Sequence, residues 1–548
     1  MSLSLPAKFA VVAAIALPAV FMRATGAHGP APLALLIFGV AVLAASFLLA
    51  WAAEAAQMDI SGGLAIAILA LIAVLPEYAI DLYFAYTAGH QPEFASYAAA
   101  NMTGSNRLLL GLGWPLVAFA TVWALSRKRG RPVRELLLSP RRRIELAFLG
   151  AAGVIAFVMP VTGQIHVALA VVLLALFGLY MWRVSRSEVT EPELIGTPAR
   201  IAALPQRRRR WTVAALFATA AIVVVTAAEP FAHALIDTGT TLGVDRFLLV
   251  QWLAPLASES PEFIVAFLLA RRGNGDDALG TLLSSKVNQW TLLIGTIPLA
   301  YLLGGGGAGL PLDERQVEEV LLTATQTALG FAVLVGLRFH VRSAVALLAL
   351  FAVQFAFPGT TARLVISAVY GALAVAVLIA RRHDLMKVVA ELRPGARWSA
   401  PARAARRTVV TLVGIGLLVT GVVLLVAPGP GLLVVALALF VLGTESDWAR
   451  RRYDRIRQRA QDLAERAVAR RSSLAMSTGG GVAMIGAGVL LVLVEELPFS
   501  GLGSGLTLSG GGVIVLATLL YAALRARQAQ ASSRSWSSVQ SMSDSSSD

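Results

Sequence analysis

Two Pro-Glu pairs inside long apolar segments are the residues of this sequence best suited to chemistry. Pro76-Glu77 lies in IAVLPEYAIDLYFAYTAGHQPEFASYAAANMTGSN, residues 72–106, and Pro261-Glu262 lies in APLASESPEFIVAFLLARRGNGDDALGTLLSSKVN, residues 254–288. Proline removes one backbone donor and frees a carbonyl in the preceding helical turn. Hard cations take oxygen ligands from carboxylates, hydroxyls and carbonyls. Each pair therefore predicts a cation-binding carboxylate beside free backbone oxygen.

The two segments form an internal repeat. In each, the Pro-Glu helix is followed by a short polar turn and then by a helix of small residues interrupted by polar ones. Gly104-Ser105-Asn106 corresponds to Ser284-Ser285-Lys286, and Gly113-Trp114-Pro115-Leu116 corresponds to Gly295-Thr296-Ile297-Pro298-Leu299. Carboxylates within apolar helices are costly and mark functional sites.

The composition is that of a protein with many transmembrane segments. The chain has 548 residues, of which 57% are hydrophobic and 14% charged, and its mean hydropathy is +0.72. About 20 apolar residues in a helix cross a hydrocarbon core of about 30 Å, and backbone groups in lipid must be satisfied within such helices. We therefore expect an all-α polytopic membrane protein.

Residue counts exclude or disfavour several other functions. The chain has no cysteine, which excludes disulfides, thiolate catalysis and metal sites with cysteine ligands. Its formal net charge of +14 comes from arginines clustered between apolar segments, where they act as a topology signal. We expect contact with membrane lipids and no nucleic acid, and no nucleophile and base pair suggests an enzyme.

Apolar runs long enough to span a membrane recur from residue 7 to residue 380. The first, 7–22, has no small-x-small cleavage site closely after it, which favours a retained helix over a signal peptide. The other predicted spans are 32–53, 60–86, 95–125, 144–160, 164–183, 211–231, 245–270, 278–303, 318–337, 340–357 and 361–380.

Basic loops predict the orientation of these spans. Each basic loop is separated from the next by two spans, so all of them can lie on the cytoplasmic side. The helix with Glu77 then runs outward and the helix with Glu262 runs inward, which makes the repeats inverted. The loops hold Arg127 to Arg129 with Arg141 to Arg143, Arg207 to Arg210, Arg271-Arg272, Arg338 with Arg342, and Arg381-Arg382.

Inverted repeats with interrupted helices are the design of secondary transporters, whose substrate site lies at the repeat interface near the midplane of the membrane. Plain duplication of a helical bundle is the alternative. Proline within helices, Gly-Ser breaks and a carboxylate in both copies favour the transporter.

At these motifs the chain resembles the sodium/calcium exchanger and cation/proton exchanger superfamily, over about residues 30–380. Members of that superfamily have two inverted repeats, each with a Ser/Thr-x-Pro-Glu helix and a Gly-Ser-Asn helix. The resemblance implies ion binding by the Pro-Glu glutamates and by polar residues of the facing helices. The implied cation ligands are Glu77, Ser105, Asn106, Ser258, Glu262, Ser284 and Ser285, with Glu77 and Glu262 as the metal-binding carboxylates.

The chain departs from the superfamily pattern at two places. Ala73, Val74 and Leu75 replace the hydroxyl residues before Glu77, and Lys286 replaces asparagine in the second repeat. An ammonium near two carboxylates repels a divalent ion and can itself take the place of a cation. Glu259, one turn before Glu262, is a candidate ion-pair partner for Lys286 and would tune the charge of the site with it.

The transported ion is open at this level. Glu77, Glu259 and Glu262 with Lys286 would carry about two net negative charges by simple count, enough for Ca²⁺ or for two monovalent ions. Exchange of Na⁺ or Ca²⁺ against H⁺ or Na⁺ by alternating access is the leading hypothesis. Asp81, one turn after Glu77, either extends the ion path or faces the outer water.

Other acidic residues have simpler predicted places. Glu54 and Asp59 fall at a cytoplasmic helix boundary, where solvation is expected. Glu318 and Glu319 belong to an acidic run, 313–319, that is typical of an exposed helix start. No histidine pattern, phosphate-binding loop or dinucleotide motif indicates a cofactor.

The C-terminal part predicts a second membrane module. In VVLLVAPGPGLLVVALALFVLGTESDWARRRYDRIRQRA, Pro428 to Gly431 would turn the chain between two apolar segments as a helical hairpin. A basic helix, 448–471, would follow on the cytoplasmic leaflet. The segment resembles the transmembrane protein family named for a Pro-Gly-Pro-Gly-Trp motif, with Leu432 in place of tryptophan.

The leading hypothesis is thus a cation antiporter in a plasma membrane, with an Ala/Arg/Gly-rich composition that suggests a bacterium. A membrane scaffold or sensor that has lost transport is the alternative, and a channel is a weaker one. The predicted parts are an N-terminal helix (1–31), a first repeat (32–183), a basic linker (184–210), a second repeat (211–382), a linker (383–407), the hairpin with the basic helix (408–471), two further spans (472–527) and a disordered Ser-rich tail (528–548).

Overall fold

The fold was examined in a computed structural model of the whole chain. The structure describes residues 5–27, 29–59, 75–185, 194, 196–392 and 471–493, with single residues between 439 and 458 and between 509 and 519. Compact packing divides the chain into two units, Met1–Arg393 and Pro394–Asp548. Each unit is considered by itself.

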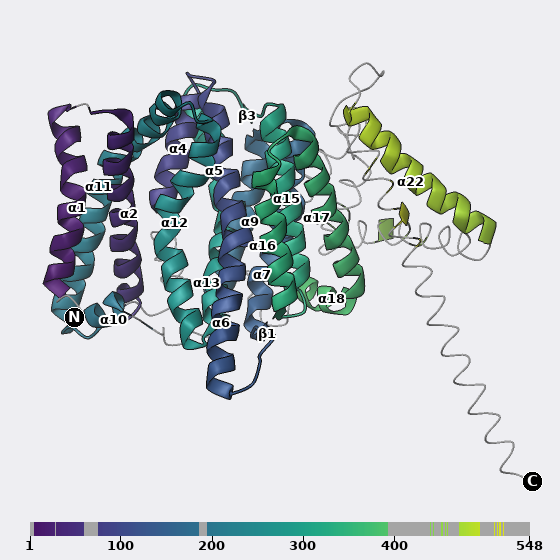
Figure 1. Ribbon diagram of the computed structural model, residues 1–548, viewed down its shortest axis with the longest axis horizontal. Helices are drawn as coiled ribbons and strands as arrows, with labels where there is room; N and C mark the ends of the chain where they lie inside the picture. Colours follow the sequence, from purple (N-terminus) through teal and green to yellow (C-terminus); the bar gives the residue numbers. More distant parts are fainter. Residues whose placement is uncertain are drawn as a thin grey trace, which may run out of the picture. The chain divides into compact units, whose positions relative to one another are not determined.

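The first unit is a helical membrane bundle, and the predicted fold class is confirmed (Figure 1). Among the described residues, eight helices are long and apolar enough to cross a membrane. The helices of the first half are α1 (Leu5–Thr25), α2 (Ala31–Ala56), α4 (Leu75–Ala88), α5 (Phe94–Leu108), η1 (Leu109–Gly113), α6 (Trp114–Arg129), η2 (Pro140–Arg142), α7 (Arg143–Ala156), α8 (Val158–Thr162) and α9 (Val167–Ser185).

The second half repeats this order after a short helix. Its helices are α10 (Thr197–Ala202), α11 (Gln206–Leu242), α12 (Arg246–Arg272), α13 (Gly275–Asn288), η3 (Gln289–Leu293), α14 (Ile294–Leu303), α15 (Glu314–Leu334), α16 (Val341–Ala356), α17 (Thr360–Ala380) and α18 (Arg382–Ala390). Each span predicted between residues 7 and 380 has a helix here, and the span with Glu77 is described from Leu75 onward.

Both repeats contain a π-helical turn at the same place. The turn η1 joins α5 to α6, and η3 joins α13 to α14. A π-turn spaces its hydrogen bonds five residues apart and occurs mostly at functional sites. These turns follow the small-residue helix of each repeat directly, so the break in the helix lies beside the predicted ligands. Proline and glycine in the sequence predicted a break but not its π form.

Two short strand pairs show how the repeats are arranged. Strand β1 (Glu135–Leu137) pairs antiparallel with β4 (Arg338–His340), and β2 (Gln164–His166) pairs antiparallel with β3 (Gly309–Pro311). By position in the repeats, β1 corresponds to β3 and β2 corresponds to β4. Exchanging the two repeats therefore turns the pair β1–β4 into the pair β3–β2, so the two strand pairs are equivalent. The sequence patterns did not predict these strands.

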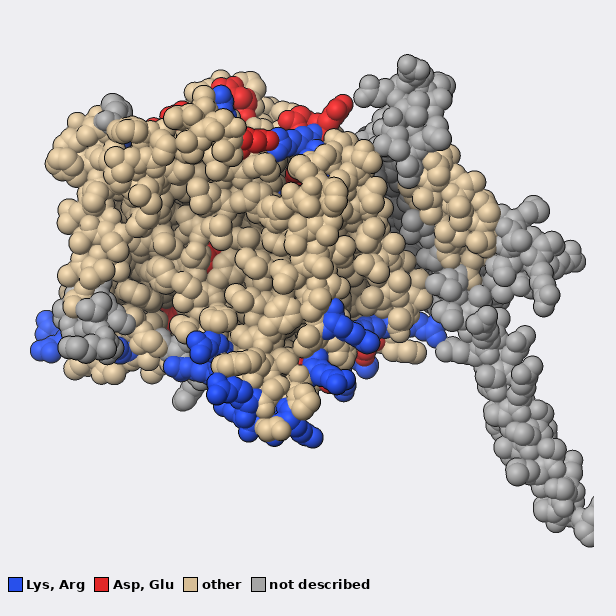
Figure 2. All heavy atoms as spheres, in the orientation of Figure 1, with Lys and Arg blue, Asp and Glu red and all other residues tan. Residues whose placement is uncertain are grey.

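The charged surface follows the predicted topology. Figure 2 shows lysine and arginine gathered at one end of the first unit, which is the end of β1 in Figure 1, whereas acidic side chains are frequent at the other end. The positive-inside rule predicts that this basic end is the cytoplasmic one. Helix α4 then runs toward the outer face, and α12, which ends at Arg271 and Arg272, runs toward the cytoplasm.

The second unit contains α22 (Arg471–Leu493). Its Gly481 packs against Gly512 and Leu516, and the Ser509 hydroxyl donates to the Ile485 carbonyl at 3.3 Å. The helix lies in the region predicted to hold two further spans, 472–527, and begins one residue before it. The predicted hairpin at 428–431 lies outside the described residues.

Candidate functional site

The centre of the bundle holds a cluster of carboxylates from α4 and α12. Glu77 and Glu259 are buried, and Glu262 is partly buried. One amide nitrogen of Gln289 donates to Glu77 Oε1 at 3.0 Å and to Glu259 Oε1 at 2.8 Å. The side chain of Gln289 therefore joins the first repeat to the second. The sequence patterns described above did not single out Gln289.

The facing helices supply hydroxyl and amide groups. The Ser285 hydroxyl donates to Glu262 Oε2 at 2.7 Å. Ser105 is fully buried, and its hydroxyl lies near the carboxylates of Glu77 and Glu259. The structure thus brings six predicted or neighbouring site residues together where α4, α5, α12, α13 and η3 meet.

Three predicted ligands make their hydrogen bonds elsewhere. The Asn106 amide donates to the Met102 carbonyl at 2.9 Å, and Ser258 donates to the Ala254 carbonyl of its own helix at 3.2 Å. Ser284 pairs with the Tyr180 hydroxyl at 3.0 Å. Ser284 therefore contacts α9, whereas its neighbour Ser285 contacts the carboxylate cluster.

Lys286 is fully buried beside the cluster. Its ammonium donates to the main-chain carbonyl of Asn106 and lies 5.7 Å from the centre of the Trp290 ring. Glu259, the candidate partner, acts on Lys286 through its charge, but its carboxylate accepts a hydrogen bond from Gln289. The Asn106 carbonyl lies just before the π-turn η1, where the hydrogen-bond spacing of the helix changes.

Asp81 lies one turn beyond Glu77 and is fully buried. Its charge interacts with that of Glu77, and Asn101 of α5 is its neighbour. The possibility that Asp81 faces the outer water is therefore wrong. Its position continues the polar cluster along α4.

Comparison with protein families assigns the chain to a family. The family described as "Sodium/calcium exchanger protein" matches residues 30–186 and 212–360. The chain belongs to that family. A second family, "Putative transmembrane protein (PGPGW)", matches residues 407–459 of the exchanger, as the Pro-Gly-Pro-Gly motif suggested.

The chain is also similar to solved structures. The crystal structure of the H⁺/Ca²⁺ exchanger CAX is 41% identical to this exchanger, covers 75% of its chain and 99% of the CAX chain, and has a TM-score of 0.66. Native YfkE is 16% identical over 66% of this chain and 98% of its own, with a TM-score of 0.46. A structure of the sodium-calcium exchanger NCX_Mj is 18% identical over 60% and 98%, with a TM-score of 0.41. Comparison with curated proteins found no match.

Two acidic residues of the exchanger are buried, although the sequence predicted that they are exposed. Glu318 and Glu319 at the start of α15 are buried, not exposed. Glu318 pairs with Arg363 at 2.8 Å, and Glu319 pairs with Arg107 at 2.5 Å. The acidic run suggested a solvated helix start because periodicity within one helix does not show which basic residues reach it from other helices.

Asp59 is also paired rather than simply solvated. Its two carboxylate oxygens accept from Arg209 at 2.7 and 2.8 Å, and Arg210 lies 3.3 Å away. These hydrogen bonds lower the pKa of Asp59 to about 2. The pair joins the cytoplasmic ends of α2 and α11.

No group of three or more histidine, aspartate or glutamate side chains in the described part of the chain is already gathered around a metal position. The cluster instead offers carboxylate, serine hydroxyl and amide oxygens. Such mixed oxygen sets suit Ca²⁺ and Na⁺.

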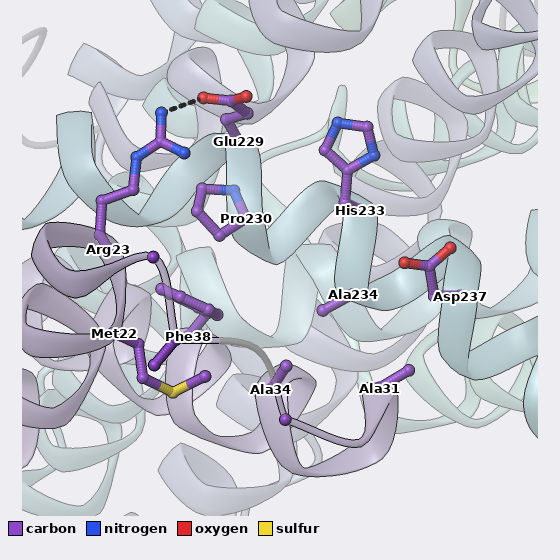
Figure 3. Close-up of a pocket in the computed structure, with 13 residues that line it drawn as sticks. Met22, Arg23, Ala31, Ala34, Phe38, Glu229, Pro230, His233, Ala234 and Asp237 are labelled. Atoms are coloured by element: carbon purple, nitrogen blue, oxygen red, sulfur yellow. Dashed lines mark hydrogen bonds and ion pairs between the residues drawn. The ribbon is translucent and has the colours of Figure 1, made fainter.

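A separate cavity of about 380 Å³ lies between α1, α2 and α11 (Figure 3). Arg23 and Glu229 form an ion pair of 2.6 Å at its edge. His233, which also lines the cavity, bonds the Tyr83 hydroxyl of α4 at 2.7 Å. None of the residues of the carboxylate cluster lines this cavity.

Proposed function

We propose that this exchanger carries Ca²⁺ across the membrane in exchange for protons by alternating access. The proposal rests on one observation. The buried carboxylates of Glu77 and Glu259 accept hydrogen bonds from the same amide nitrogen of Gln289, and Glu262 lies beside them. The cluster joins the two inverted repeats, where transporters of this architecture place their substrate. The 41% identity to an H⁺/Ca²⁺ exchanger favours protons over Na⁺ as the counter-ion.

The charges of the cluster suit this exchange. Glu77, Glu259 and Glu262 carry three negative charges when ionised, and Lys286 carries one positive charge. The net charge of about −2 is neutralised by one Ca²⁺ or by two protons. Since an uncompensated charge inside a membrane is costly, each ion favours release of the other, which is the basis of obligatory exchange.

We assign ligand roles on this basis. Glu77 and Glu262 bind the cation directly, and Ser285 and Ser105 supply hydroxyl oxygen near them. Gln289 orients Glu77 and Glu259. We expect no resident cofactor, because the inorganic cations are the cargo.

A degenerate scaffold or sensor without transport is the second candidate, and Lys286 is the observation that favours it. A buried ammonium bonded to the Asn106 carbonyl occupies space that a cation would otherwise use. Lys286→Asn separates the two candidates. A transporter with this substitution changes its ion selectivity or pH dependence, whereas a scaffold is unaffected in every flux assay.

We place the exchanger in the plasma membrane of a bacterium, with its basic face toward the cytoplasm. The proposal is tested in proteoliposomes by imposing Na⁺, Ca²⁺ and pH gradients in turn on the wild type and on Glu262→Gln. Ca²⁺ uptake that is driven by a pH gradient and lost in the variant is the expected result. Ca²⁺ uptake that is driven only by a Na⁺ gradient would show that Na⁺, not the proton, is the counter-ion. The absence of any flux from folded protein would overturn the proposed transport.

A further inference from the structure

Arg107 is a buried cation within the membrane bundle that the exchange reaction described above does not use. It directly follows Asn106 on α5, and 2% of its side chain is exposed. Its guanidinium lies 2.5 Å from Glu319 of α15, donates to Gln354 of α16 at 3.0 Å, and lies 5.0 Å from the ring centre of Trp252. An ionised residue in such a place is a candidate functional group.

Gln251 completes a ring of polar contacts that includes this ion pair. Its amide nitrogen donates to Glu319 Oε2 at 3.2 Å and to the Thr103 hydroxyl at 3.1 Å. Thr103 lies one turn before Arg107 on α5. The ring therefore runs from Arg107 to Glu319, Gln251, Thr103 and back along α5, and it ties α5 to α12 and α15.

The ring lies at a close approach of α5 and α12. A Cβ atom on Gly104 would lie 1.7 Å from the main-chain oxygen of Gln251. Gly104 is followed by Ser105, which interacts with the carboxylates, and α12 carries Glu259 two turns beyond Gln251. The ring thus sets the spacing of the two helices that bring hydroxyl and carboxylate groups to the cluster.

The other repeat has a comparable arrangement on the cytoplasmic side. Glu145 of α7 and Glu319 of α15 both lie 19 residues before the strand that follows their helices, β2 and β4. Arg142 lies 3.4 Å from Glu145 and reaches Asp276 and Asp277 at the start of α13 at 3.3 and 2.9 Å. In each repeat an arginine-carboxylate contact therefore links the helix behind the site to the small-residue helix of the other repeat.

We propose that Arg107, Glu319 and Gln251 are positioning residues that determine the cation affinity of the exchanger. They touch no transported ion. They hold α5 against α12 so that Ser105 and the Asn106 carbonyl keep their places beside Glu259 and Lys286. A displacement of about 1 Å in a bound group is enough to cost about a hundredfold in activity. The ion pair of Arg107 and Glu319 holds the ring together, because separating the two residues would leave a buried charge unpaired.

This inference rests on the proposed Ca²⁺ exchange, so the test first requires pH-driven Ca²⁺ uptake by the wild type. We then compare Arg107→Gln and Gln251→Leu with the wild type for KM, maximal rate and equilibrium binding of radioactive Ca²⁺ in detergent. We expect Arg107→Gln to weaken Ca²⁺ binding at least tenfold and to raise KM more than it lowers the maximal rate. Gln251→Leu, which keeps the ion pair, should weaken binding about threefold.

The matched control is Arg315→Gln. Arg315 pairs with Asp245 at 2.7 Å and lies 4.2 Å from the ring centre of Phe247, and both contacts tie α15 to the start of α12. Its Ca²⁺ affinity should stay within twofold of the wild type. If folded Arg107→Gln binds Ca²⁺ as the wild type does, the positioning role is wrong. Should Arg107→Gln fail to fold, unchanged affinity in Gln251→Leu overturns the role. No uptake by the wild type would instead refute the proposed function.

Discussion

Gln289 donates from one amide nitrogen to Glu77 at 3.0 Å and to Glu259 at 2.8 Å, across the boundary between the two repeats. Gln289 is the first residue of the π-turn η3. The first residue of the matching turn η1 is the apolar Leu109. The site is therefore asymmetric although the fold is symmetric, and the second repeat supplies the bridging amide as well as the buried lysine.

The first prediction concerns the two principal carboxylates. Glu77→Gln and Glu262→Gln should each lower Ca²⁺ uptake by about a hundredfold or more, because Ca²⁺ affinity depends strongly on the number of charged ligands. Uptake of radioactive Ca²⁺ into proteoliposomes measures this. Glu93→Gln is the matched control, since Glu93 is exposed in the turn before α5. Normal uptake in either of the first two variants would remove that glutamate from the site.

The second prediction concerns the bridging amide. Gln289→Leu should lower Ca²⁺ affinity by about tenfold, because residues that orient ligands typically contribute 10- to 100-fold to metal affinity. Equilibrium binding of Ca²⁺ to the purified protein is the measurement. Gln91→Leu in the exposed turn after α4 should leave the affinity unchanged. Equal affinities for the two variants would show that Gln289 orients nothing.

The third prediction concerns the contact between α5 and α12. Gly104→Ala should destabilise the protein by about 1–3 kcal/mol, because the added methyl group overpacks a closed helix contact. Thermal unfolding in detergent detects this change. Gly178→Ala in α9 is the control, because a Cβ there meets no atom within 4 Å. A melting temperature for Gly104→Ala at or above that of Gly178→Ala would contradict the close approach.

The fourth prediction concerns Asp59 at the cytoplasmic ends of α2 and α11. Its pKa is lowered from 3.8 to about 2, mainly by its hydrogen bonds to Arg209. The folded protein therefore binds this proton less readily than the unfolded chain, so the pair stabilises the fold fully above about pH 4 and loses its effect as the pH falls toward 2.

The measurement for Asp59 is thermal unfolding from pH 7 to pH 2. Asp59→Asn should be less stable than the wild type at neutral pH, and the difference should disappear near pH 2. Asp384→Asn serves as the control, because the exposed Asp384–Lys387 pair contributes little. A difference that persists at the lowest pH would rule out the ionised pair as its cause.

Some features of this protein followed from local sequence. Apolar runs of membrane-spanning length predicted the helices, because the thickness of the bilayer sets how many apolar residues a spanning helix needs. Basic loops predicted the inverted orientation, and the family match confirmed the exchanger resemblance carried by Pro76-Glu77 and Pro261-Glu262. These properties depend on short stretches of chain and on the surrounding lipid.

Tertiary structure decided how the polar side chains are paired. The acidic run predicted an exposed Glu319, and the spacing in α12 made Glu259 the candidate partner of Lys286. In the structure Glu319 pairs with Arg107, and the ammonium of Lys286 donates to the Asn106 carbonyl. Each of these contacts joins residues at least 180 positions apart. The physical reason is that a buried charge takes whichever partner the packing of distant helices brings within about 3 Å, and no local pattern contains that distance.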